Sequence, residues 1–339
     1  MKPTKFAKYL TEYLTVYLPN ERGYSPNTVK SYRDNMLLLL TFMRDKYNIG
    51  AEKIDFTDIT QERVVAYLDW LESERGCSVS TRNSRLSSIH AFFRFMLYRS
   101  PEHIHEWHRI LAIKVKRTHT ASVVYLTPEG IKLFLEQPDT TMTKGRRDLA
   151  MLSLMYECAG RVQEVADLTP SRVHFGKPTT LTIKGKGNKT RIVPISEPGA
   201  KLLRQYMEET GLLNDWANER PLFDNGQQDK LSRKSIAVIV RKYADRAREQ
   251  DKKIIPEGVS PHSLRHSKAM MLQESGINLV YIRDFLGHAS ITTTEIYARI
   301  SQRQKMEAIE KTSLSPDPDK LPVWQKNKGL LQWLESLGK

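Results

Sequence analysis

The sequence predicts a mainly α-helical fold in two domains, with one small β-hairpin in the second domain. Apolar side chains recur at the spacing of a buried helix face throughout residues 1–112. Residues 179–195 are instead rich in β-branched side chains and are interrupted by the turn-forming run Gly185-Lys186-Gly187-Asn188, the pattern of two strands joined by a turn. A chain of 339 residues is long enough to build two separate cores.

The first domain, residues 1–112, is expected to be a helical bundle. Its first helix carries the apolar side chains of residues 6–14. The second begins at Ser25, a favoured N-cap that is followed by a proline at the first helical position. The third follows Thr60, and the fourth begins at Ser80. Helices joined by such short connections pack as a compact bundle.

A basic stretch with little apolar periodicity, residues 113–124, is expected to link the domains. The second domain, residues 125–312, is expected to be α+β, because helical patterns both precede and follow the hairpin. Residues 313–339 begin as a proline-rich joint and end in a leucine-rich stretch that suits a short helix. A helix this short must pack on something, either its own domain or a neighbouring subunit.

The charge balance points to a polyanionic partner. Lys and Arg number 53 against 39 Asp and Glu, which gives a net charge of +14. Such an excess favours nucleic acid first, with a membrane surface as the alternative. No apolar stretch approaches the ~18–20 residues that a membrane span needs, and no signal-peptide pattern follows Met1. We therefore expect a DNA-binding protein with no membrane partner.

The cysteines and histidines predict neither a disulfide framework nor a metal site. Cys77 and Cys158 are too few for either, which fits a reducing, cytosolic setting. His103, His105 and His108 lie close together, but their spacing matches no common zinc pattern.

Two predicted helix starts in the first domain combine small polar and basic side chains. With the free N–H groups of a first helical turn, such side chains hold DNA phosphates and probe the grooves. They also suit ordinary caps and solvated faces, so the pattern alone leaves both interpretations open. The predicted DNA contacts are Ser25, Thr28 and Lys30 in one start and Ser80, Thr81, Arg82, Asn83 and Arg85 in the other. A basic helix predicted from Ser232 to Arg248 adds Arg233 and Lys234, which suit either the major groove or a solvated face.

The region after Ser260 holds the densest set of reactive side chains. A good N-cap and a following proline predict a helix start there. His262 and Arg265 are three residues apart, on one face of its first turn, where unpaired N–H groups and the positive end of the helix dipole favour a phosphate. His288 and a helix that carries Tyr297 follow. The spacing predicts an anion site with a phenol beside it.

Four segments together resemble the tyrosine recombinase (phage integrase) family, which includes Xer recombinases and transposon integrases. They are AGRVQEVADL from residue 159, GKGNKTRIVPI from residue 185, PHSLRHSKA from residue 261 and LGHASITTTEIYARI from residue 286. The first domain likewise resembles the family's helical core-binding (SAM-like) bundle. The resemblance covers about residues 1–312 and implies that bundle followed by an α+β catalytic domain.

The resemblance implies a role for each residue that matches the family's motifs. Two arginines clamp the scissile phosphate, a tyrosine attacks it, two histidines and a turn lysine assist, and an acidic residue supports the site. In that order they are Arg161 and Arg265, Tyr297, His262 and His288, Lys186, and Glu164. The family's usual Thr-Gly-Leu-Arg is Cys158-Ala159-Gly160-Arg161 here, and we interpret this departure as a change in packing.

These residue types suit attack on a phosphodiester. Guanidinium forks match the charged oxygens of a phosphate better than lysine does. A tyrosine is a poor nucleophile and needs a base, for which His262 is the best candidate. Lys186 would protonate the departing 5′ oxygen, and His288 would bond a phosphate oxygen. The resulting 3′-phosphotyrosine keeps the bond energy for rejoining, so we predict no cofactor.

The resemblance thus implies a site-specific DNA recombinase that acts as a homotetramer on two DNA duplexes carrying inverted-repeat sites, in the bacterial cytoplasm at the nucleoid. The rival from another class is a helix-turn-helix regulator, because residues 268–300 alternate helices and glycines. That reading leaves Arg161 and Lys186 without a purpose. A type IB topoisomerase shares the chemistry but needs no paired sites.

Overall fold

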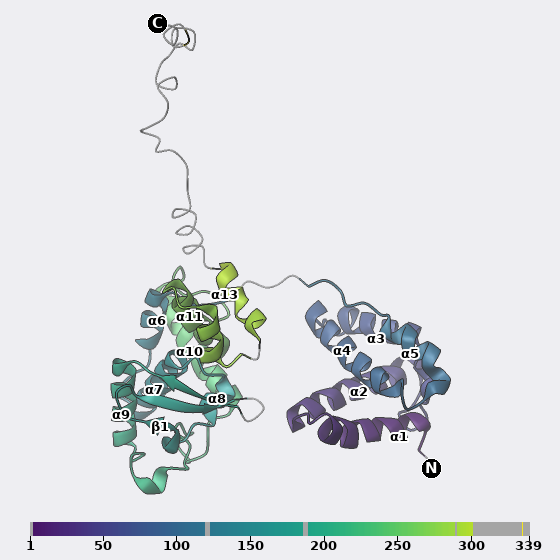
Figure 1. Ribbon diagram of the computed structural model, residues 1–339, viewed down its shortest axis with the longest axis horizontal. Helices are drawn as coiled ribbons and strands as arrows, with labels where there is room; N and C mark the ends of the chain where they lie inside the picture. Colours follow the sequence, from purple (N-terminus) through teal and green to yellow (C-terminus); the bar gives the residue numbers. More distant parts are fainter. Residues whose placement is uncertain (1–2, 119–122, 186–188, 289, 301–333, 335–339) are drawn as a thin grey trace. The chain divides into compact units, whose positions relative to one another are not determined.

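A computed structural model of the protein describes residues 3–118, 123–185, 189–288, 290–300 and 334. The chain divides into two compact units, Met1–Ala121 and Ser122–Lys339 (Figure 1). Most described residues are helical, and a small antiparallel sheet lies in the second unit, as the sequence predicts. Lys186 and the predicted joint and short helix of residues 313–339 lie outside the described residues, apart from Leu334. In the described part of the chain, no helix is both long and apolar enough to cross a membrane.

The first unit is a helical bundle. Its elements are α1 (Lys5–Glu12) with a π-helical continuation (Tyr13–Glu21), α2 (Pro26–Tyr47), α3 (Gln61–Ser73), α4 (Val79–Met96) and α5 (Ile104–Leu111). The predicted caps Ser25 and Thr60 are confirmed, because each side chain accepts a hydrogen bond from the first helical turn. The predicted start of α4 at Ser80 is wrong. The hydroxyl of Ser78 is the acceptor for that helix, which places Ser80 inside its first turn.

The core of this unit is largely aromatic. Phe6 and Tyr13 pack against Phe92 of α4, and Trp107 of α5 packs against Phe93. The sequence did not predict α5. That helix is short, but its tryptophan is fully buried and donates a hydrogen bond to a backbone carbonyl 3.1 Å away. Burial of this side chain therefore fixes a helix that length alone would leave marginal.

The second unit holds the sheet and the remaining helices. These are α6 (Pro128–Leu135), α7 (Thr143–Glu157), α8 (Val162–Ala166), β1 (Val173–His174), β2 (Thr180–Lys184), β3 (Thr190–Pro194), α9 (Glu197–Glu209), α10 (Arg233–Gln250), α11 (Pro261–Glu274), α12 (Leu279–Leu286) and α13 (Glu295–Ile300). The strands pair antiparallel in the order β1-β2-β3, so the predicted hairpin gains one short strand.

The register of the hairpin determines where an arginine points. Ile183 of β2 lies opposite Arg191 of β3. Directly opposed residues of an antiparallel pair point to the same face of the sheet. Because Ile183 is buried in the core, the Arg191 side chain is directed to the same side, toward α8 and α12.

The helices after the sheet bring distant segments together. Within this unit α7 packs against α9 and α11, α12 packs against β3, and α13 lies beside α11 (Figure 1). The predicted helix start at Ser260 is confirmed. Asn278 caps α12 by accepting from a backbone N–H, and Gly287 ends it in the left-handed conformation. The sharp stop at Gly287 turns the chain back so that α13 returns to α11.

One buried polar group in the first unit generates a stability prediction. The Asn35 amide on α2 donates to the backbone carbonyl of Arg85 at 2.9 Å and accepts from the Tyr67 hydroxyl at 3.1 Å. Replacing Asn35 with Leu leaves both partners without this bond in a dry core. We expect a loss of about 2 kcal/mol in the unfolding free energy, measured by hydrogen exchange at the amides of α2 and α4.

The matched control is Thr41→Val on the same helix. The Thr41 hydroxyl donates a solvent-exposed hydrogen bond to the carbonyl one turn earlier. This variant should stay within about 0.5 kcal/mol of the wild type. An Asn35→Leu protein as stable as the control would show that the buried network contributes nothing.

Candidate active site

The last carbonyls of α12 accept hydrogen bonds from three arginines on three different elements. The carbonyls at a helix C-terminus have no partner within the helix and lie at the negative end of its dipole, so cations are favourable there. The bonds run from Arg191 Nε to the Phe285 carbonyl (3.0 Å), from an Arg265 terminal nitrogen to the Leu286 carbonyl (2.7 Å) and from an Arg161 terminal nitrogen to the Gly287 carbonyl (3.0 Å). Strand β3, α11 and the start of α8 are thereby tied to one short segment.

Gly287 is required in this segment for two reasons. Its φ of +65° lies in the left-handed region that side chains disfavour. A Cβ at this position would also come within 3.0 Å of the Arg191 guanidinium. A larger residue would therefore strain the backbone and displace an arginine that holds the end of α12.

Glu164 forms hydrogen bonds with two of these arginines. Its carboxylate accepts from the Arg161 backbone N–H at 2.9 Å, from the Arg161 guanidinium at 2.7 Å and from the Arg191 guanidinium at 2.7 Å. Burial alone would raise the pKa of this carboxyl, but the hydrogen bonds from Arg191 and Arg161 outweigh it and hold the pKa below its usual range. The group is thus a carboxylate at neutral pH and fixes the Arg161 fork.

Arg191 was not among the predicted site residues. It lies inside the segment GKGNKTRIVPI that carried the resemblance. The strict alternation of a strand gave the available signal, because Arg191 falls on the same face as the buried Ile183 and Val193. A cation on the core face of a strand needs a buried partner, and Glu164 is that partner.

Arg265 is buried, with 4% of its surface exposed. Burial, helped by the nearby charge of Arg161, lowers its pKa to about 10, which still leaves it a cation at neutral pH. Its second bond goes to the carbonyl of Ala159 at 2.7 Å. A guanidinium carries five N–H donors, so Arg161 and Arg265 each keep donors beyond the two bonds described here.

Ala159 is fully buried, as our interpretation of the departure before Arg161 predicts, but it has a backbone role as well. Its φ of +45° lies in the left-handed region. An alanine there costs roughly 1–2 kcal/mol relative to ordinary backbone. The conformation directs the Ala159 carbonyl to Arg265, so this position matters for the backbone as well as for packing.

Tyr297 is almost fully buried and its hydroxyl contacts a histidine. The phenolic oxygen lies 2.8 Å from Nδ1 of His266, the residue directly after Arg265. Burial raises the pKa of Tyr297, and the nearby Arg265 charge opposes that rise. Sequence reasoning missed His266, although it lies one helical turn after His262 and hence on the same face.

The two predicted histidines occupy different surroundings. His262 is exposed in the first turn of α11, and its ring centre lies 6.4 Å from that of His266. His288 is partly buried, and its Nδ1 lies 2.9 Å from the hydroxyl oxygen of the fully buried Thr294. Burial, with the charges of Arg265 and Arg161, lowers the pKa of His288 to about 4. The structure thus brings together Arg161, Glu164, Arg265, His288 and Tyr297, with His262 at the edge, while Lys186 lies outside the described residues.

The predicted DNA contacts differ in how far their side chains are exposed. Ser25, Lys30, Ser80 and Thr81 are exposed, while Thr28, Asn83 and Arg85 are partly buried; in the second unit Arg233 and Lys234 are exposed at the start of α10. Arg82 requires a correction. Only 4% of it is exposed, and it donates to the carbonyl of Lys114. We therefore no longer propose Arg82 as a DNA contact.

Asn83 already makes hydrogen bonds within its own unit. Its amide donates to the carbonyl of Lys116 and accepts from the N–H of the same residue. Together with buried Ile113, these bonds hold the beginning of the predicted linker against the bundle.

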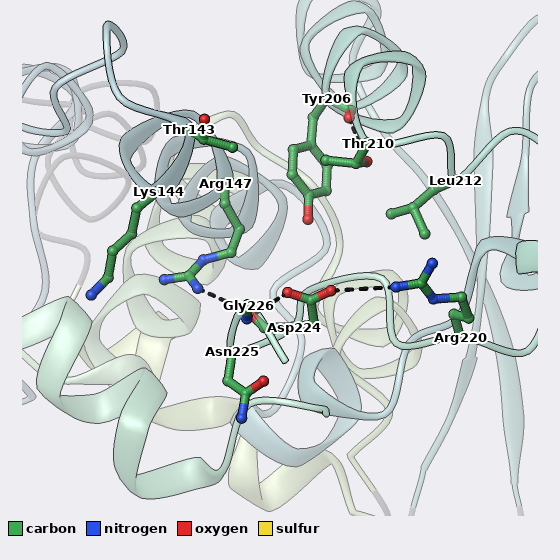
Figure 2. A pocket seen from close by; sticks show the side chains of 10 residues that line it. All are labelled: Thr143, Lys144, Arg147, Tyr206, Thr210, Leu212, Arg220, Asp224, Asn225 and Gly226. Carbon is green, nitrogen blue, oxygen red and sulfur yellow. Dashed lines mark hydrogen bonds and ion pairs between the residues drawn. The ribbon is translucent and has the colours of Figure 1, made fainter. Parts of the chain in front are cut away.

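A separate cavity of about 300 Å³ opens between α7 and α9 (Figure 2). Arg147 in its wall donates to the backbone carbonyl of Asp224 at 2.8 Å, and Arg220 lies 3.9 Å from the Asp224 carboxylate. None of its lining residues belongs to the group around Tyr297. Arg147 already has a protein acceptor and Arg220 already pairs with a carboxylate, so we assign this cavity no part in the chemistry.

Glu164→Gln is predicted to destabilise the second unit. The change leaves the guanidinium of Arg191, which is 12% exposed, without its counter-charge. Breaking a buried pair in this way costs about 3–5 kcal/mol of unfolding free energy. The pKa of Glu164 is lowered in the folded state, so its stabilisation is present above its usual pKa of 4.5 and is lost as the pH falls below that value. The difference in Tm between wild type and variant should therefore be large at pH 7 and shrink at pH 3.5.

Asp167→Asn serves as the matched control. Asp167 lies at the end of the same helix and pairs with Lys230 at 2.7 Å, but both side chains are largely exposed. An exposed pair contributes about 0–1 kcal/mol. Equal destabilisation by the two variants would contradict the structural role of the Glu164 cluster.

Comparison with known proteins agrees with this geometry. The phage integrase family matches residues 124–304, and the N-terminal SAM-like domain of phage integrases matches residues 10–100. The putative integrase/recombinase y4rC of Sinorhizobium fredii is 32% identical over 336 residues, 99% of each chain. The tyrosine recombinase XerD of Staphylococcus epidermidis is 30% identical over 298 residues, 87% of this chain and 95% of that one.

Solved structures show the same fold. The XerH site-specific recombinase bound to a palindromic difH substrate superposes with a TM-score of 0.66 at 20% identity, over 85% of this chain and 81% of that one. The family match from residue 124 to residue 304 spans more than half of the sequence, and the helical bundle before it matches as well. The protein therefore belongs to the phage integrase family of tyrosine recombinases.

Proposed function

We propose that this protein is a site-specific DNA recombinase that cuts and rejoins DNA strands through a covalent bond to Tyr297. One observation carries the proposal: the hydroxyl of Tyr297 lies 2.8 Å from Nδ1 of His266, the residue that directly follows the buried Arg265 on α11. Arg161 belongs to the same cluster, because it contacts Gly287 beside the Leu286 carbonyl that Arg265 binds. A nucleophile and two phosphate-binding forks thus share one unit of one chain.

The chemistry follows from what each group can donate. The free N–H donors of Arg161 and Arg265 would bind the non-bridging oxygens of the scissile phosphate, where negative charge grows during attack. Tyr297 attacks phosphorus, a phosphorus–oxygen bond to tyrosine forms, and the bond to the 5′ oxygen breaks. Lys186 would supply the proton for that oxygen, and His288 would bond a phosphate oxygen. The 5′ hydroxyl of another strand reverses these steps.

A regulator that only binds DNA accounts less well for the cluster. Such a protein needs exposed cations, whereas Arg265 is buried and Arg191 is mostly covered, and backbone carbonyls and Glu164 hold them in fixed orientations. Buried, preoriented donors are the arrangement that stabilises developing charge in a transition state. The DNA contacts proposed for binding itself are Ser25, Thr28, Lys30, Ser80, Thr81, Asn83, Arg85, Arg233 and Lys234.

The partner and its arrangement follow from the same proposal. The net charge of +14 supports a DNA partner. Exchange of strands between two duplexes needs four cuts, so we propose a homotetramer acting on paired inverted-repeat sites. The two relatives compared above come from bacteria, and we propose that this protein likewise acts on DNA in the bacterial cytoplasm.

The tail of the chain supplies a proposed contact between protomers. Residues 313–339 contain a leucine stripe, Leu330, Leu331, Leu334 and Leu337, after a proline-rich joint. An apolar groove of about 410 Å³ between β3, α11 and α12 could receive such a stripe from an adjacent protomer. Ile192 and Tyr281 in its wall are 68% and 71% exposed, which is unusual for large apolar side chains.

The Tyr297→Phe variant tests the function. It removes the attacking oxygen and leaves the arginines in place, so we expect DNA binding without any covalent adduct. The measurement is a denaturing gel of protein mixed with a nicked duplex that carries the site found by footprinting, with wild type alongside. Wild-type protein that shifts DNA in native gels but never forms an adduct would favour the regulator. Adduct formation by Tyr297→Phe would place the nucleophile elsewhere.

Deletion of residues 321–339 tests the proposed contact between protomers. We expect tetramer formation on paired sites to fall at least tenfold, while binding to a single site is unchanged. Ile192→Glu in the groove should act in the same direction, and Trp216→Glu, 66% exposed outside the groove, is its control. Native gels with one and with two sites measure both quantities. Tetramers that form normally without the tail would refute this part of the proposal.

A further inference from the structure

We propose that His266 is the proton acceptor for Tyr297: it holds the phenolic hydroxyl and takes its proton as the phenol attacks the DNA phosphate. This inference rests on the proposed function and replaces the assignment of that role to His262. Its basis is the hydrogen-bonding distance between Nδ1 of His266 and the Tyr297 oxygen.

The contact is built into the packing of two helices. Tyr297 is 1% exposed and lies among the apolar side chains of α11 and α12, including Met270 and Ile282. Its ring centre is 5.8 Å from that of His266. A buried hydroxyl needs a partner, and the histidine on α11 supplies one 2.8 Å away. The phenol is thus oriented by the same helix that carries Arg265.

The imidazole is in the protonation state that an acceptor requires. Burial, together with the charges of His262 and Arg265, lowers the pKa of His266 to about 4. The ring is therefore neutral at pH 7. With its proton on Nε2, the lone pair of Nδ1 accepts the phenolic O–H. The groups that face this imidazole are His262 and Arg265 on α11, Tyr297 on α13, and His288 after α12.

His262 occupies a different position. It is exposed in the first turn of α11, whereas His266 lies one turn further into the helix and bonds the phenol directly. Free N–H groups and the positive end of the helix dipole lie at the first turn, which suits contact with a phosphate oxygen. The two histidines therefore divide the work: His262 faces the DNA, and His266 faces the nucleophile.

The arrival of the phosphate changes the balance between the two groups. In the resting protein the pKa of Tyr297 is raised and that of His266 is low, so the proton stays on the phenol. A bound phosphodiester adds a negative charge beside Arg265 and offsets the repulsion that Arg265 exerts on the ring. As the oxygen–phosphorus bond forms, the phenolic O–H bond breaks and a bond from hydrogen to Nδ1 forms. The proton returns to the phenol when the strand is rejoined.

The test compares His266→Asn with His266→Gln in the full chain on the nicked duplex defined above. The asparagine amide lies near the Nδ1 position and keeps a hydrogen bond, but it cannot accept a proton. The glutamine amide lies near the Nε2 position, so it neither keeps the hydrogen bond nor accepts a proton. We expect both variants to form the adduct about 10²–10⁴ times more slowly than wild type, with unchanged DNA affinity. His174→Asn, an exposed histidine on β1, controls for loss of any histidine.

The pH dependence separates a proton acceptor from a group that only positions the phenol. The wild-type rate of adduct formation should rise with pH and then level off, once the acceptor is neutral. In His266→Asn the rate should keep rising about tenfold per pH unit, because only hydroxide then removes the proton. His262→Asn should retain the levelling, whatever its rate. A His266→Asn protein with the wild-type profile and a rate within threefold of wild type would overturn the proposal.

A measurement without DNA guards against misfolded variants. In the full chain labelled with ¹⁵N-histidine, one Nδ1 resonance should show the shift of a hydrogen-bond acceptor and should move in Tyr297→Phe. A spectrum unchanged by that substitution would overturn the contact itself. Absence of any adduct in the wild type would instead count against the recombinase function, so the two failures are distinguishable.

Discussion

The hydrogen bonds that three arginines donate to the end of α12 are the constraint on which the rest of the site depends. Arg161, Arg191 and Arg265 come from different elements. Each donates a hydrogen bond to a carbonyl at the end of α12 that has no partner within that helix. The buried carboxylate of Glu164 pairs with both Arg161 and Arg191 and offsets the repulsion between these two cations. The same bonds therefore stabilise the fold, orient the guanidiniums that we propose bind phosphate, and fix the segment that leads to Tyr297.

Burial gives the site its chemical character. A guanidinium taken out of water keeps its charge only because carbonyls and a carboxylate surround it, and its field in turn disfavours protonation of the neighbouring imidazoles. The result is a cluster of fixed cations beside neutral histidines and a protonated phenol. The charge of such a site favours binding of an anion over binding of a neutral molecule.

The sequence predicted the helical bundle, the hairpin and the helix starts at Ser25, Thr60 and Ser260, because caps and alternation are local signals. It also named the family residues that gather around Tyr297. It missed His266 and Arg191, whose roles depend on partners 31 and 27 residues away along the chain. The sequence placed Arg82 on the surface, because a basic side chain after a cap usually lies there. In the structure Arg82 is instead buried and donates a hydrogen bond to the carbonyl of Lys114 in the predicted linker. The left-handed Ala159 has no local signal at all, since alanine normally avoids that conformation.

The enclosed phenol has a consequence for life inside a cell. A protein with a net charge of +14 binds any DNA through its phosphates and meets far more wrong sequences than right ones. Each such encounter would threaten the chromosome if the reactive oxygen stood open to solvent. Because the Tyr297 side chain is covered in the resting protein, a phosphate that only touches the surface meets no open phenol.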